Sequence, residues 1–299
     1  MSLGRRWVLT AVAGGFLTGC TSAPGPAERS QDPSSPPGSG PGTVPTPSVA
    51  PPSPATPSPK PAPRVTRAAT VARYGRMTPT GWGFTAPGVV TKLPPAAGRA
   101  IALTFDACGG PGGGGYDREL IDLLRARKVP ATLFLNARWI DANRAHFEQL
   151  ASDPLFEIAN HGTRHRPLSV SGRSAYGIAG TRDAGEVFDE VAGNQDKLTA
   201  LLGHPPRFFR SGTAYCDDIA ARIVAELGER FAGFSVNADA GATFTPAQVR
   251  RAALTATAGS VVIGHMNHPA GGTAEGMARA LPALLAAGHR FVRLSDAVH

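Results

Sequence analysis

Apolar runs alternate with amphipathic segments from about residue 98 to the end of the chain. Each run is short and predicts a strand; the runs lie at 100–105, 131–136, 156–160, 207–209, 231–236, 260–265 and 290–294. The segments between them predict helices at about 117–127, 141–152, 183–202, 217–227, 246–257 and 274–287. Strands separated by helices pair in parallel as βαβ units. About seven such units favour an α/β fold of the (β/α) barrel type over an open doubly wound sheet.

Two segments of different composition precede this α/β region. In residues 1–20 an apolar stretch follows Arg5 and Arg6; it is too short to span a bilayer and is typical of a secretory signal. Residues 21–66 are rich in Pro, Ser, Gly and Thr and cannot bury a core. We therefore expect a signal peptide, an extended disordered linker, and one domain over residues 67–299.

The signal segment ends in Leu-Thr-Gly-Cys, with the cysteine at Cys20. This resembles the lipobox of bacterial lipoproteins, in which the cysteine becomes the lipidated first residue of the mature chain. An ordinary cleaved signal is the alternative, and the Arg5-Arg6 pair leaves the export route open between the general and twin-arginine pathways. The resemblance implies an exported protein with a lipid anchor in the outer face of the cell membrane, whose linker extends into the cell wall.

The charge of the chain narrows the class of partner. The net charge is +8 at pH 7, but the 30 lysines and arginines are scattered rather than gathered in one run or helix stripe. Such scatter argues against nucleic-acid binding and suits a negatively charged cell envelope. We expect a monomer with no nucleic-acid partner.

Polar residues stand at the ends of five predicted strands. They are Asp106, His161, Arg210, Asp239 and His265. In (β/α) barrels the catalytic groups lie where strands end and loops begin. These five residues therefore predict one site at the mouth of the barrel.

The segment NHGTRHRPLS holds two histidines, His161 and His165, four residues apart. On a helical turn this spacing puts both imidazoles on one side, close enough to share a metal ion, and histidine suits Zn²⁺ and similar divalent ions. The alternative is two unrelated surface histidines in an arginine-rich loop.

Four segments in order, ALTFDACGG, ANHGTRH, FFRSGTAY and GSVVIGH, resemble the motifs of the polysaccharide deacetylases, the NodB-homology or carbohydrate esterase family 4 enzymes. The resemblance covers about residues 98–299. It implies a distorted (β/α) barrel and removal of an N- or O-acetyl group from a sugar by metal-activated water. A divalent ion, with Zn²⁺ favoured, is then expected on His161 and His165.

The resemblance also implies a role for each of the other residues. Asp106 matches the catalytic base and His265 the histidine that protonates the departing amine. Arg210 matches an arginine that pairs with the base, and Asp239 falls where an aspartate orients the acid histidine. Tyr215 falls near a tyrosine whose backbone N–H helps to bind the oxyanion.

The first motif departs from the family pattern. Two consecutive aspartates are usual, the second of which binds the metal, but Ala107 occupies the second place. Asp106 then binds the metal itself, or the two histidines hold it with an extra water, or Asp117 reaches in. We favour Asp106 as the third ligand, because Asp117 is expected to cap the helix that follows it.

The chain has three cysteines. If Cys20 carries lipid, Cys108 and Cys216 remain as an even pair in an oxidising compartment, and each follows a site motif. We expect a Cys108–Cys216 disulfide. The alternative is that Cys108 supplies a thiolate to the metal.

The sequence does not name the sugar polymer. The anchor and linker favour peptidoglycan, with N-deacetylation of GlcNAc- or MurNAc-type sugars, ahead of chitin-like oligomers, exopolysaccharide and acetylated xylan. An O-acetyl esterase acting on xylan is one alternative. A wall-binding lipoprotein that keeps the fold and lost turnover with the second aspartate is another.

Overall fold

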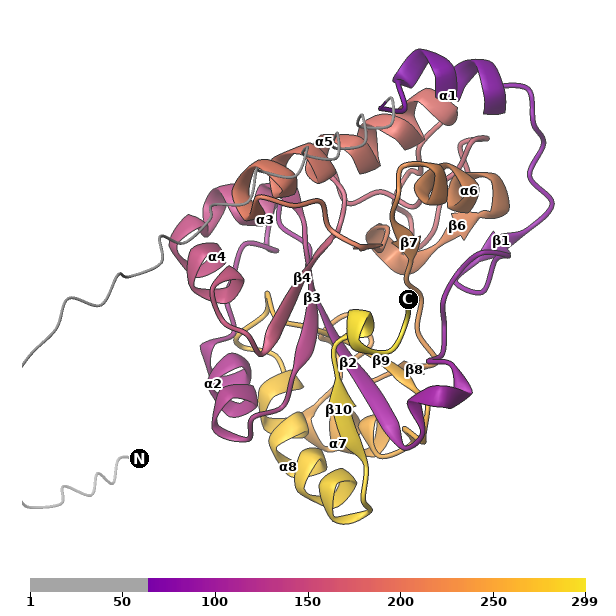
Figure 1. Cartoon of the computed structure of the whole chain (residues 1–299). Coiled ribbons are helices and arrows are strands. Elements are labelled where there is room, and N and C mark those ends of the chain that lie inside the picture. Colours follow the sequence, from indigo (N-terminus) through magenta and orange to yellow (C-terminus); the bar gives the residue numbers. More distant parts are fainter. Residues whose placement is uncertain (1–63) are drawn as a thin grey trace, which may run out of the picture. The chain divides into compact units, whose positions relative to one another are not determined.

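The computed structural model describes residues 64–299 (Figure 1). The expected signal peptide, Cys20 and nearly all of the expected linker lie outside the described residues. Within residues 64–299, no helix combines the length and the apolar composition needed to cross a bilayer.

One curled sheet organises the described region. Its strands follow the order β7-β5-β4-β3-β2-β9-β8, with β10 also paired to β2, and every one of these pairings is parallel. The strands are β2 (Ala100–Ala107), β3 (Ala131–Leu135), β4 (Phe156–Asn160), β5 (Phe208–Phe209), β7 (Arg230–Phe231), β8 (Val236–Asn237), β9 (Val261–His265) and β10 (Arg290–Val292). The expected distorted (β/α) barrel is confirmed.

Helices surround this sheet in Figure 1. They are α1 (Arg67–Tyr74), α2 (Arg118–Ala126), α3 (Ala137–Ala142), α4 (Arg144–Ala151), α5 (Ala184–Leu202), α6 (Asp218–Glu226), α7 (Pro246–Ala253) and α8 (Thr273–Ala286). Local sequence sets where several of them begin: Asp117, Asp183 and Asp217 each accept a hydrogen bond from a backbone N–H in the first turn of α2, α5 and α6.

Several parts of the described region, α1 among them, were not expected from the apolar pattern. The segment expected as one helix over 141–152 belongs to α3 and α4, which meet at Asn143. A short antiparallel pair also forms between β1 (Trp82–Gly83) and β6 (Cys216–Asp217).

Strand β2 shows how the pattern positions the site. All eight of its residues are buried, as is usual for a parallel strand covered on both faces. Ile101, Leu103 and Phe105 pack in the cluster that includes residues of α2, α7 and α8, whereas Ala100 and Ala102 pack inside the barrel with residues such as Phe134. Alternation along the strand therefore directs the even-numbered positions inward.

The expected strand over 231–236 is wrong as a single element. It is split into β7 and β8, which pair with β5 and β9 at opposite edges of the sheet. Between them Ala232 pairs with Val90 and, on the β9 side, Ser260 pairs with Lys92. We call this region, residues 232–235 with 90–92, the seam. An apolar run has the same pattern whether it stays on one edge or crosses from one edge to the other.

Gly233 lies at the seam where the backbones approach closely. A Cβ atom at this position would meet Val89 Cγ1 at 2.7 Å and the Phe84 carbonyl oxygen at 2.9 Å. We expect Gly233→Ala to destabilise the protein by about 1–3 kcal/mol through overpacking. Urea unfolding followed by fluorescence measures the change.

Gly114→Ala is the matched control, because a Cβ atom there meets nothing within 4 Å. Equal unfolding midpoints for the two variants would contradict close packing at the seam.

Candidate functional site

A cavity of about 590 Å³ opens at the carboxyl ends of the strands. Its lining comes from the segments that follow β2, β4, β5, β8 and β9, where barrel enzymes place their functional groups. Polar lining residues include Asp106, Cys108, His165, Thr213, His265 and His268.

Asp106 forms a buried ion pair with Arg210. Arg210 Nη1 donates to Asp106 Oδ1 at 2.7 Å, and the two side chains are 0% and 4% exposed. The guanidinium also donates to the carbonyl oxygens of Ala232 and Gly233 at the seam, at 3.1 Å and 2.9 Å, and lies over the Phe134 ring. Arg210 is therefore held from three sides, and its charge is directed at Asp106.

Burial alone would raise the pKa of Asp106, but the charges of Arg210, His161 and His265 outweigh it, so that the pKa lies below its usual value. Arg210 occupies only one carboxylate oxygen. Asp106 Oδ2 lies 3.6 Å from His161 Nε2. The carboxyl is thus held as an anion with one oxygen directed toward the histidine.

The orientation of His161 follows from the backbone of Arg210. His161 is fully buried, and its Nδ1 lies 2.8 Å from the Arg210 carbonyl oxygen, which only accepts hydrogen bonds. The proton of a neutral imidazole therefore sits on Nδ1, and Nε2 keeps its lone pair. A backbone carbonyl behind a histidine is the arrangement that orients metal-binding imidazoles.

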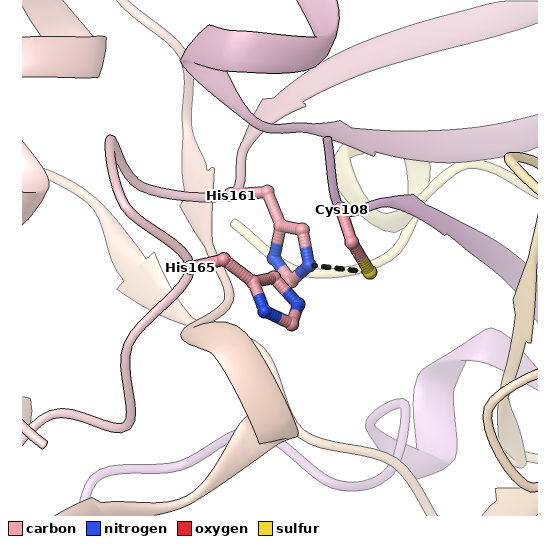
Figure 2. Close-up of side chains that lie close together, drawn as sticks. All are labelled: Cys108, His161 and His165. Carbon is pink, nitrogen blue, oxygen red and sulfur yellow. Dashed lines mark hydrogen bonds between the residues drawn. The ribbon is translucent and has the colours of Figure 1, made fainter. Parts of the chain in front are cut away.

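Cys108, His161 and His165 lie close together (Figure 2), and Cys108 and His165 line the cavity. Their ligand atoms all lie within 4.8 Å of one another, and Cys108 Sγ is 3.8 Å from His161 Nε2. Two imidazole nitrogens and a sulfur suit Zn²⁺ and similar ions. The donor set therefore fits the divalent ion expected from the sequence.

The two histidines converge through a loop, so the helical turn expected from their spacing is wrong. His165 adopts a left-handed backbone conformation with φ of 61°, and its ring meets that of His161 at 78° with centroids 4.9 Å apart. Gly212, from the loop after β5, packs directly on the His165 backbone, where a Cβ atom would lie 2.2 Å from the carbonyl oxygen. Contacts between loops hold the pair together.

Asp239 and His265 form a second buried acid–base pair. His265 Nδ1 lies 2.9 Å from Asp239 Oδ1, while the His265 backbone N–H and the Thr273 hydroxyl donate to Asp239 Oδ2. Burial would lower the pKa of His265, but the hydrogen bond and charge of Asp239 hold it well above its usual value. The pair directs Nε2 of a protonated imidazole at the cavity.

Tyr215 contributes to an aromatic rim rather than to the cavity wall itself. Its ring packs against Trp82, Phe84 and Tyr176, with centroids 5.6, 4.8 and 5.5 Å away. Tyr176 lines the cavity and remains 75% exposed. No sequence motif marks Tyr176 or Trp82, because β1 and the loop before α5 meet the site only in the folded chain.

The expected Cys108–Cys216 disulfide is wrong, since both cysteines are free. Cys108 faces the histidines, whereas Cys216 lies in β6 within an apolar cluster, with its sulfur 3.9 Å from the Gly83 carbonyl oxygen. Burial raises the pKa of the Cys216 thiol, while the neighbouring histidines outweigh burial at Cys108 and hold its pKa well below the usual range. The disulfide was expected because two cysteines remained after Cys20. The position of Cys216 in β6, which directs its side chain away from the cavity, could not be predicted from that number.

Two other expectations about the metal ligands have different outcomes. Asp117 caps α2 by accepting from Leu120 N–H at 3.0 Å, as expected. The favoured third ligand, Asp106, is not in the compact donor group, and Cys108 takes that place.

The sequence profile of one family, described as polysaccharide deacetylase, matches residues 94–232. No curated protein sequence matches the chain. Among solved structures, a family 4 carbohydrate esterase pseudoenzyme from Bacillus anthracis superposes with a TM-score of 0.60 at 18% identity, over 72% of this chain and 70% of that one.

Two further solved structures share the fold. A peptidoglycan N-acetylglucosamine deacetylase gives a TM-score of 0.58 at 20% identity, over 78% of this chain and 97% of that one. A family 4 acetyl xylan esterase from Clostridium thermocellum, solved with a cobalt ion, gives 0.55 at 21% identity, over 66% of this chain and 89% of that one.

The matched residues contain the ends of β2, β4 and β5, and with them Asp106, both clustered histidines and Arg210. The parallel curled sheet is the fold that these esterases share. Residues 94–232 of the chain therefore match the polysaccharide deacetylase family, and the described region has the fold of the family 4 carbohydrate esterases.

Proposed function

We propose that this chain is a metal-dependent hydrolase that removes acetyl groups from an extracellular polysaccharide, with N-acetylated peptidoglycan sugars as the favoured substrate. The observation that carries the proposal is a pair of buried acid–base couples, Asp106–Arg210 and Asp239–His265. One member of each couple, Asp106 and His265, lines the same cavity as His165. Two titratable groups whose surroundings shift their pKa values in opposite directions supply a base and an acid at one pH.

His161 and His165, with one further protein ligand, would hold a divalent ion, for which Zn²⁺ is the favoured identity. When bound, such an ion polarises the acetyl carbonyl and makes water more acidic.

Asp106 serves as the general base. Arg210 keeps the carboxyl ionised and occupies Oδ1, so Oδ2 is free to accept the proton of the attacking water. Burial of both groups prevents bulk water from screening the pair.

His265 serves as the general acid. Asp239 holds Nδ1 and keeps the imidazole protonated, so Nε2 donates its proton to the departing amine. The backbone N–H of Tyr215 is proposed to assist at the oxyanion, because the preceding residues, Thr213 and Ala214, line the cavity.

The aromatic rim supports a sugar polymer as the substrate. Tyr176 offers an exposed ring at the edge of the cavity, and Arg173 lies over the Trp82 ring 4.9 Å from its centroid. An exposed aromatic ring beside a cavity of about 590 Å³ suits the apolar face of a sugar ring. An anchor at Cys20 and an extended linker would place this cavity and its aromatic rim within a peptidoglycan layer.

A wall-binding protein without turnover is the second candidate. Ala107 removes the carboxylate that usually binds the metal, and one structure of similar fold is a pseudoenzyme. Such a protein would bind glycan without releasing acetate.

Acetate release separates the two candidates. We expect release from at least one of peptidoglycan, chitin oligomers and acetylated xylan, dependent on added Zn²⁺. Replacement of both His161 and His165 by Ala should abolish bound metal and acetate release together. His204→Ala, an exposed histidine elsewhere, is the control. Undiminished release by the double variant would overturn the metal mechanism.

Asp106→Asn keeps the size of the side chain and removes the proton acceptor. We expect kcat to fall by roughly 10²–10⁴-fold, the usual contribution of a general base, while zinc content stays at one ion per chain. Zinc content and initial rates of acetate release test this expectation. An unchanged kcat would remove Asp106 from the mechanism.

Asp239→Asn should change the pH dependence of turnover. His265 donates its proton only below its pKa, and Asp239 raises that pKa. The loss of activity at high pH should therefore begin at a lower pH in the variant, as seen in kcat measured against pH. Asp196→Asn, at an exposed position on α5, should leave the profile unchanged. A profile unaffected by Asp239→Asn would mean that another group is the acid.

A further inference from the structure

We propose that the sulfur of Cys108 is the third protein ligand of the metal, and that Asp106 acts as base without binding the ion. The role of the ion in catalysis rests on the proposed function, whereas the identity of the ligand does not depend on turnover.

Strand alternation favours Cys108 over its neighbour. Ala107 is fully buried in the same cluster as Leu103 and Phe105, on the helix-covered face of β2. Asp106 and Cys108 point the other way and line the cavity. The position that usually carries the metal-binding carboxylate therefore faces an apolar core here, and the next residue faces the histidines.

The donor distances suit a single ion. With Zn–S near 2.3 Å and Zn–N near 2.0–2.1 Å at tetrahedral angles, a sulfur and a nitrogen on one ion lie about 3.5 Å apart. Cys108 Sγ and His161 Nε2 are 3.8 Å apart, and all three donors lie within 4.8 Å of one another. Small rotations of the three side chains would bring their donor atoms to the distances that a single ion requires.

Asp106 already binds another partner through one of its two oxygens. Its Oδ1 is bonded to a guanidinium that is completely buried, and the same guanidinium is fixed by the seam carbonyls. Binding of the carboxylate to a cation would compete with this ion pair. The sulfur of Cys108, by contrast, lies 3.8 Å from His161 Nε2 and within 4.8 Å of a ring nitrogen of His165.

The inferred ligand set predicts the choice of metal. Two imidazoles and a thiolate favour Zn²⁺ and Co²⁺ over the oxygen-preferring ions Mg²⁺ and Mn²⁺. Three protein ligands would leave one position of a four-coordinate ion for water or substrate, as in catalytic zinc sites.

The test uses the full-length chain loaded with Co²⁺ or Zn²⁺ alone. The wild type should show thiolate-to-cobalt charge-transfer absorption in the near ultraviolet, and a sulfur shell at about 2.3 Å in zinc X-ray absorption. Both signals should disappear in Cys108→Ala and in Cys108→Asp, and persist in Cys20→Ser, Cys216→Ala and Asp106→Asn. Near-ultraviolet circular dichroism verifies that each variant is folded.

Metal affinity provides a second readout. Cys108→Ala should weaken Zn²⁺ binding by more than the roughly 10–100-fold that loss of an outer-shell partner costs. Cys108→Asp should recover part of that loss, because a carboxylate also binds zinc, while the sulfur signals stay absent.

The outcomes separate this inference from the proposed function. Sulfur signals that survive in Cys108→Ala, or a stoichiometric zinc site without sulfur in the wild type, would overturn the ligand assignment. Sulfur signals without acetate release would support the assignment and overturn the proposed turnover. A folded chain that binds neither ion would overturn both.

Discussion

The buried ion pair between Asp106 and Arg210 is the interaction on which the rest of the site depends. Two charges inside a barrel are costly to desolvate, and removing one partner would leave the other uncompensated. The pair persists because Arg210 also donates to the two seam carbonyls and stacks on Phe134. The Arg210 carbonyl oxygen in turn fixes the ring of His161. One residue thus positions both the anion and a histidine of the donor group.

The sequence predicted the parts of this arrangement that local patterns determine. Apolar runs located β2, β3, β4 and β9, and polar residues at strand ends located Asp106, His161, Arg210, Asp239 and His265. Capping chemistry identified Asp117 as the start of α2. These predictions succeed because strand burial and helix capping depend on neighbouring residues.

Features that depend on distant contacts were missed or wrong. The run over 231–236 crosses from one edge of the sheet to the other, and its apolar pattern does not distinguish this path from a single strand. An even number of cysteines led us to expect a disulfide, but β6 directs Cys216 into an apolar core, where Gly83 of β1 is its neighbour. The inward direction of Cys108 was readable from the alternation of Thr104 and Asp106, although only the fold shows that His161 and His165 face it.

The seam also bears on how the chain folds. Val90 pairs with Ala232, a residue far along the sequence. In the strand order β7 and β8 stand at opposite ends, so the two edges of the sheet are connected through this distant segment. A contact of such separation has a large loop-closure entropy cost, which must be met before it stabilises the chain. The carbonyl oxygens that hold the Arg210 guanidinium belong to this same segment. The Asp106–Arg210 pair therefore depends on contacts between residues far apart in the sequence, which form slowly. We expect the reactive groups to reach their final positions only when the barrel has closed at the seam.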